Sequence, residues 1–215
     1  MSRFDPTMDA AFREYAELEL RCHHLLLEGK EDAPETAAAE DRMEELWEKL
    51  DETQRQCLSG MGSDLNWVRR KGEPPPKGRK AAEEVAATEQ QQLVEAIGSK
   101  QWHKTLHYLR VCAPMLRVDA LANLRGRLYQ AIGLPTYASV FYEQAADLDP
   151  ANAEIGLSAL STIKNANPAN AVRRAEKIIA APLRYPPAVL AVAAAMILQR
   201  DETDDRPIDR QRFSA

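Results

Sequence analysis

Two histidines lie at a spacing that could bind a metal ion. His103 and His107 are one helical turn apart, and Cys112 follows them. Two His side chains at positions i and i+4 of a helix can bind the same zinc ion. The zinc-protease signature also needs a Glu directly after the first His, and Lys104 occupies that position. We therefore expect both histidines to flank the buried face of their helix, and we predict no metal there.

The segment Cys22-His23-His24 raises the same question. Consecutive residues of a helix point in different directions, so only one of the two histidines could join Cys22. Cys22 falls on the apolar face of its predicted helix, and we interpret it as a core residue. The chain has 3 cysteines, widely spaced and without a CxxC motif. This pattern favours a reducing compartment, so we expect a cytoplasmic protein without disulfides, bound metal or cofactor.

Paired carboxylates are frequent, but their context does not indicate catalysis. Pairs such as Glu44-Glu45 and Glu83-Glu84 fall on the polar faces of predicted helices. General acid–base catalysis needs a carboxylate whose pKa is shifted by burial or by a like charge. The sequence also has no GxSxG, GxxxxGK[ST] or GxGxxG motif. We therefore predict no catalytic residue and no enzyme activity.

Charge is distributed unevenly along the chain. Residues 1–60 carry 7 Lys/Arg and 16 Asp/Glu, whereas residues 61–80 carry 6 and 2, within a total net charge of −5. The basic stretch could contact RNA, an acidic lipid surface or the acidic segment before it. Overall acidity disfavours nucleic acid as a partner. The most apolar run, residues 189–198, is shorter than the ~20 residues that span a bilayer, so we predict no membrane insertion.

The first 60 residues predict an antiparallel helical hairpin. Asp5-Pro6 resembles a helix start, and apolar residues then recur every three or four positions until Gly29. After a turn around Pro34, a second amphipathic pattern runs from Met43 through Leu50 to Met61. Two helices make a thin core, so the hairpin needs a partner, either the second half of the chain or another copy.

Residues 61–80 read as a basic linker and residues 201–215 as a disordered charged tail. Pro74, Pro75 and Pro76 exclude a helix interior in the linker. Trp67 is its one large apolar residue, and we expect it to hold the start of the linker against the fold. The tail is charged and almost without apolar residues.

The region 81–200 contains an internal repeat. Ala96-Ile97-Gly98 recurs as Ala131-Ile132-Gly133, an offset of 35 residues, and an aromatic residue follows each Gly at the fourth position. These aromatic residues are Trp102 and Tyr137. A fixed period in the thirties is typical of stacked helix pairs. Together with the scarcity of Gly, this predicts an all-α fold.

The stretch 119–152 resembles a tetratricopeptide repeat. The family's small, aromatic and proline positions fall on Gly126, Tyr129, Ala138, Tyr142, Ala145 and Pro150, and its turn between two helices falls on Gly133. Ala122 and Arg125 depart from the family, which prefers large apolar residues there. The preceding unit, about 84–117, keeps only Gly98 and Trp102 with Leu106. The resemblance, extended over 84–200, implies about three helix pairs and a capping helix near 187–199.

The resemblance also implies a function and a binding surface. Such stacks usually hold a peptide or a helix on the concave side, which the first helix of each pair lines. The corresponding positions here are Thr88, Gln92, Glu95, Asn123, Arg127 and Gln130. Arg127 with Asn123 could bind a carboxylate, although all six could equally be ordinary polar helix faces. We thus expect a non-catalytic scaffold or adaptor that binds another protein. The alternative is a self-assembling structural protein that oligomerises through residues 1–60.

Overall fold

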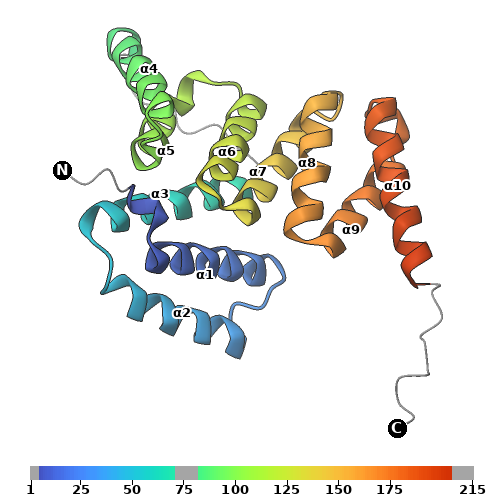
Figure 1. Cartoon of the computed structure of the whole chain (residues 1–215), viewed down its shortest axis with the longest axis horizontal. Coiled ribbons are helices and arrows are strands. Elements are labelled where there is room, and N and C mark those ends of the chain that lie inside the picture. Colours follow the sequence, from blue (N-terminus) through green and yellow to red (C-terminus); the bar gives the residue numbers. More distant parts are fainter. Residues whose placement is uncertain (1–4, 71–81, 205–215) are drawn as a thin grey trace. The chain divides into compact units, whose positions relative to one another are not determined.

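The structure, a computed structural model, describes residues 5–70 and 82–204. These residues form ten α-helices and no strand, which confirms the all-α class (Figure 1). The chain divides into two compact units, Met1–Leu148 and Asp149–Ala215. The sequence had suggested one repeat domain over 81–200 behind a separate hairpin. The division at residue 148 corrects this, because the first two helix pairs belong to the same unit as the N-terminal helices.

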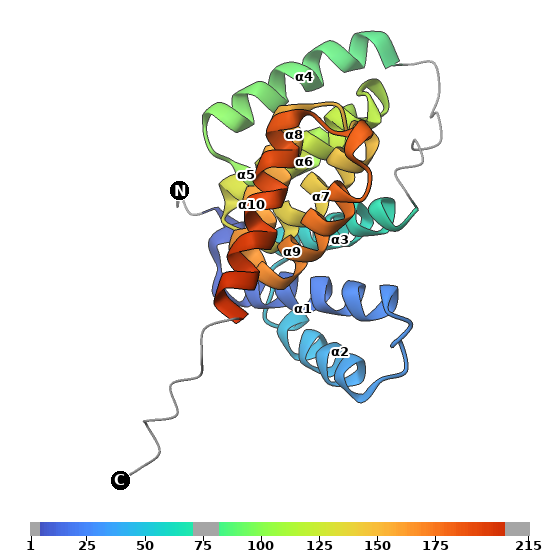
Figure 2. The ribbon, with the colours of Figure 1, turned by 90° about the vertical axis from the view of Figure 1, so that its right-hand side faces the viewer.

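Unit 1 begins with a short 3-10 helix, Pro6–Met8, followed by α1 (Ala10–Leu27) and α2 (Pro34–Trp47). The carboxylate of Asp9 caps α1 by accepting hydrogen bonds from the backbone of Ala11 and Phe12, at 2.9 and 3.2 Å. The predicted start at Pro6 was therefore one turn too early. Gly29, at φ +71°, lies in the turn after α1, and α1 packs beside α2 as the predicted hairpin (Figure 2).

The second helix of the predicted hairpin is in fact two helices. α2 ends at Trp47 and α3 (Glu52–Arg69) begins after a break. Asp51 causes the restart, because its carboxylate accepts from the backbone N–H of Gln54 at 2.8 Å. The Gln54 side chain accepts in return from the backbone N–H of Asp51 at 2.9 Å. This reciprocal capping box starts a new helix where the apolar pattern alone suggested a continuous one.

α3 extends into the predicted linker. Residues 61–69 form the second half of this helix rather than linker, and residues 71–80 lie outside the described residues. α3 packs between α1 on one side and the later helices of unit 1 on the other (Figures 1 and 2). The N-terminal helices therefore find their partner in the second half of the same chain.

The rest of unit 1 is two consecutive helix pairs. α4 (Ala82–Gly98) pairs with α5 (Trp102–Cys112), and α6 (Val118–Ile132) pairs with α7 (Pro135–Leu148). Gly133 ends α6 in the left-handed conformation, at φ +83°. A Cβ placed on Gly126 would lie 2.9 Å from the ring of Tyr142, so only Gly allows this close approach between α6 and α7.

The residues expected to pack between the repeat helices differ in how deeply they are buried. Tyr129, Ala138, Tyr142 and Ala145 are buried between α6 and α7. Gly98 is exposed, and a Cβ there would meet nothing within 4 Å, so it makes no close helix contact. Trp102 and Pro150 are partly exposed, the first at the start of α5 and the second in the turn after α7.

Unit 2 contains α8 (Ala153–Ala166), α9 (Pro168–Ile179), a 3-10 helix at Pro182–Arg184, and α10 (Pro187–Asp204). Asn167 caps α9 ahead of Pro168, because its side chain accepts from the backbone N–H of Asn170 at 3.1 Å. The last helix runs beyond the expected end at residue 199. Residues 201–204 thus belong to α10 rather than to a disordered tail, and residues 205–215 lie outside the described part of the chain. None of the helices described is long and apolar enough to cross a membrane.

Candidate functional site: a buried ionic junction and an apolar pocket

A buried carboxylate joins α3 to the helix pairs. Asp64 of α3 is 2% exposed, and its Oδ1 lies 2.6 Å from Nη2 of Arg125 on α6. The hydroxyl of Tyr129 donates to Oδ2 at 2.9 Å, and Nε of Arg110 on α5 donates to the same oxygen at 3.3 Å. Three donors from two other helices thus compensate the burial of one charge. We call this cluster, Asp64 with Arg110, Arg125 and Tyr129, the ionic junction.

The ionic junction explains how Arg125 occupies an inward position of α6. A large apolar residue is expected at this inward position, and Arg125 is indeed only 5% exposed. Its guanidinium lies 4.6 Å from the centre of the Trp67 ring, which stacks on it as an aromatic face does on a planar cation. Trp67 therefore holds the end of α3 against α6, the role expected for it. Asp64 supplies the negative charge that allows an arginine in the core.

Two glycines bring α3 close to its charged neighbours. A Cβ on Gly60 would clash with the guanidinium of Arg110, and a Cβ on Gly62 would clash with the carboxylate of Glu19 on α1. The apolar pattern of the sequence ends at Met61, between these two glycines. The structure shows that both glycines are helix residues, and their missing side chains leave room for the guanidinium and the carboxylate.

Glu19 and His23 are one turn apart on α1, and burial favours the neutral form of each. Burial raises the pKa of Glu19 to about 7, while the hydroxyl of Tyr137, donating at 2.8 Å, opposes the rise. Burial, with the nearby His24 and Arg69, lowers the pKa of His23 to about 4. Such shifts can mark catalytic groups.

The cavity beside Glu19 and His23 does not favour a catalytic role. It measures about 210 Å³, and Cys22 and Gly62 also line it. Pockets that bind small molecules are usually larger, from about 300 Å³ upward. Burial also raises the pKa of Cys22, so its thiol is not activated as a nucleophile. These groups are explained as polar side chains made neutral by burial between packed helices.

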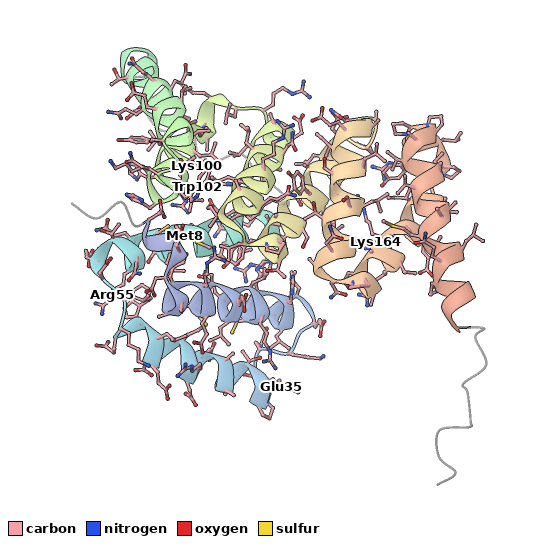
Figure 3. All side chains as sticks on the ribbon, in the orientation of Figure 1. Met8, Glu35, Arg55, Lys100, Trp102 and Lys164 are labelled. Carbon is pink, nitrogen blue, oxygen red and sulfur yellow. The ribbon has the colours of Figure 1, made fainter. Side chains whose placement is uncertain are left out.

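An apolar pocket of about 300 Å³ opens between α4, α5 and α6. Leu93 and Ile97 of α4 line it together with Trp102 and Leu109 of α5 and Leu124 and Leu128 of α6. Ile97 and Leu124 remain 48% and 36% exposed, so the apolar surface is open to solvent. Arg127 supplies the only charged side chain among the described residues that line it. We call this site the α4–α6 pocket, and Figure 3 labels Trp102 at its α5 side.

Only one of the six predicted binding residues reaches the α4–α6 pocket. Arg127 lines it, whereas the other five do not: Thr88, Gln92, Glu95, Asn123 and Gln130. The Gln130 side chain instead accepts a hydrogen bond from the hydroxyl of Tyr142 at 3.0 Å. The prediction chose polar positions of the first helices, while the structure presents their apolar positions Ile97 and Leu124.

His103, the first of the two histidines spaced like metal ligands, lies in the first turn of α5 beside Asp5. Asp5 accepts from the backbone N–H of Trp102 at 2.6 Å, and its Oδ2 lies 3.2 Å from Nδ1 of His103. Burial raises the pKa of Asp5, but hydrogen bonds from Thr7 and His103 outweigh it and leave the pKa lowered. Asp5 thereby caps α5, whose own N-cap residue makes no side-chain bond. No group of three or more potential metal ligands occurs among the described residues.

Sequence reasoning missed the ionic junction and the pocket for different reasons. Asp64 and Arg110 looked like ordinary charged residues, and the one available signal was Arg125 in an apolar position of the repeat. Ile97 and Leu124 looked like core residues, because an amphipathic pattern does not show which apolar positions a neighbouring helix leaves uncovered. In comparisons with known proteins, no family model, no curated protein and no solved structure matches this chain.

Proposed function

We propose that this protein is a non-catalytic scaffold that binds a segment of another protein in the α4–α6 pocket. The observation that carries the proposal is the open apolar surface of Ile97 and Leu124 beside Arg127. Solvent-exposed apolar clusters rimmed by polar residues are typical of binding sites. A helix or an extended peptide with a large apolar side chain and an adjacent carboxylate fits this surface best, because Arg127 can pair with the carboxylate.

The packing of unit 1 supports this side as the binding side. α1 contacts α7, α3 contacts α5 and α7, and α3 also reaches the inner side of α6 through the ionic junction. The pocket instead lies where the first helices, α4 and α6, meet α5. The tetratricopeptide resemblance places the binding surface on the first helices, so the two lines of argument agree.

The test is a comparison of recovered partners from the native cell. Ile97→Asp and Arg127→Glu should each remove the same partners, because one removes the apolar anchor site and the other repels the carboxylate. Leu183→Asp is the matched control, because Leu183 is fully exposed and lies in unit 2. Thermal unfolding of each variant shows that the fold is kept. Retention of every wild-type partner by folded Ile97→Asp would contradict the proposal.

A further inference from the structure

Unit 2 has a groove of its own with a basic rim. It measures about 590 Å³ and lies between α8, α9 and α10. Ala171, Val172 and Met196 form an apolar floor, and three cations surround it: Lys164, Arg173 and Arg200. Glu176 is the only acidic side chain among the described residues that line it. We call this site the basic groove, and Figure 3 labels its Lys164.

Two of the cations in the basic groove have no acidic partner among the residues that the structure describes. Arg200 pairs with Glu176 at 2.6 Å, and Lys164 donates to the neutral side chain of Gln199 at 3.1 Å. No carboxylate in the described part of the chain pairs with Lys164 or Arg173. Residues 149–200 carry 6 Lys/Arg and 3 Asp/Glu, so the surroundings are also positive. Carboxylates from outside unit 2 would compensate these charges.

The chain itself carries a surface of the opposite charge on α2. Residues 31–52 contain 10 Asp/Glu and 2 Lys/Arg. One side of α2 packs on α1, and the other side is exposed, with Ala37 and Ala38 followed by Asp41 and Glu44. No described cation pairs with Asp41 or Glu44, and like charges one turn apart on a helix repel each other. The two alanines are small enough for the helix to approach an apolar floor.

We propose that the basic groove binds the acidic outer face of α2 from a second copy of the chain. Asp41 and Glu44 of one copy meet Lys164 and Arg173 of the other, while Ala37 and Ala38 lie on the apolar floor. The two surfaces are different, so the association is head to tail and can continue from copy to copy. One helix in one groove buries less area than a stable dimer, so the association is weak and depends on concentration and salt.

Two charge-reversed variants of the full chain test this pairing by sedimentation velocity. The groove variant carries Lys164→Glu and Arg173→Glu, and the helix variant carries Asp41→Lys and Glu44→Lys. Wild type should associate as its concentration rises, and each variant alone should associate at least about tenfold more weakly. An equimolar mixture of the two variants should associate again, because the intact groove meets the intact helix and the two charge-reversed surfaces are also complementary to each other. A chain with all four changes should regain association.

The same sedimentation experiment includes two control variants and has two outcomes that would overturn the proposal. Glu17→Lys on α1 and Arg184→Glu in unit 2 change exposed charges away from both surfaces and should associate as wild type does. A wild-type chain that stays monomeric at all concentrations overturns the proposal. So does a mixture of the two folded variants that stays monomeric while wild type associates. Neither result bears on the α4–α6 pocket, which shares no residue with these surfaces.

Discussion

The ionic junction and the α6–α7 pair bury their side chains equally well but by different means. Between α6 and α7, Tyr129 stacks on Phe141 with ring centres 5.1 Å apart, and Gly126 lies against the ring of Tyr142. In the ionic junction, a carboxylate from α3 meets two guanidinium groups. Tyr129 belongs to both, because its ring packs in the pair while its hydroxyl binds Asp64.

The two regions should therefore lose stability differently when a side chain is replaced. Apolar packing loses stability gradually as contacts are removed, because each contact contributes little. A buried charge loses much more when its partner is removed, because the remaining charge stays desolvated. The α6–α7 pair should therefore tolerate small changes, while the ionic junction should depend on each member.

Removal of the carboxylate should have the largest effect. Asp64→Leu leaves Arg125 buried and Arg110 partly buried without an anion, so we expect the free energy of unfolding to fall by about 4 kcal/mol. Urea unfolding followed by circular dichroism measures the loss. Glu14→Leu, which breaks the exposed ion pair with Arg42, is the matched control and should cost far less.

A double-mutant cycle separates the charge effect from the loss of packing. When Arg125→Leu is added to Asp64→Leu, the second change should recover stability, because it removes the buried unpaired cation. We expect a coupling free energy of about 2 kcal/mol or more between the two sites. Losses that simply add would show that the two charges do not depend on each other.

The next effect concerns pH. The folded pKa of Glu19 is raised to about 7, above its ordinary value of 4.5, so the folded state binds the proton more tightly than the unfolded state does. This contribution to stability is present at low pH and is lost as pH rises from about 4.5 through 7. Glu19→Gln removes this pH dependence. The free energy of unfolding of the variant, relative to that of wild type, should therefore be about 2 kcal/mol higher at pH 8 than at pH 5.

Chemical unfolding at the two pH values measures the change at Glu19. Glu17→Gln, at an exposed position of the same helix, is the control and should differ from wild type equally at both pH values. If Glu19→Gln also shows the same difference at pH 5 and pH 8, its carboxyl is not held neutral by the packing of α1 against α3.

The smallest effect is expected in the α6–α7 pair. Gly126→Ala places a methyl group 2.9 Å from the Tyr142 ring, which costs packing energy, but alanine also favours the helix by about 1 kcal/mol. The net loss should be about 1 kcal/mol, well below that of Asp64→Leu, and independent of salt. Thermal unfolding at 50 and 500 mM NaCl checks both points, and a loss as large as that of Asp64→Leu would remove the contrast between the regions.

The sequence predicted the α6–α7 pair better than it predicted α3 and the ionic junction. Gly133 and the apolar positions of α6 and α7 were predicted, because a helix pair is coded by neighbours within about 35 residues. The extent of α3 was not predicted, because Gly60 and Gly62 look like helix breakers until Arg110 and Glu19 are placed against them. Of the six predicted binding residues, Arg127 alone lines the α4–α6 pocket, and the other five stay predictions.

The sequence by itself determined that this chain is helical, that α6 ends at Gly133, and which faces of the helices are apolar. These properties depend on local spacing and capping, which act over a few residues. Only the tertiary structure decided that α3 continues to Arg69, that Asp64 and Arg125 meet in the core, and that Ile97 and Leu124 stay uncovered. The physical reason is that a charge or an apolar side chain takes its role from the residues packed against it, and those lie far away in the sequence.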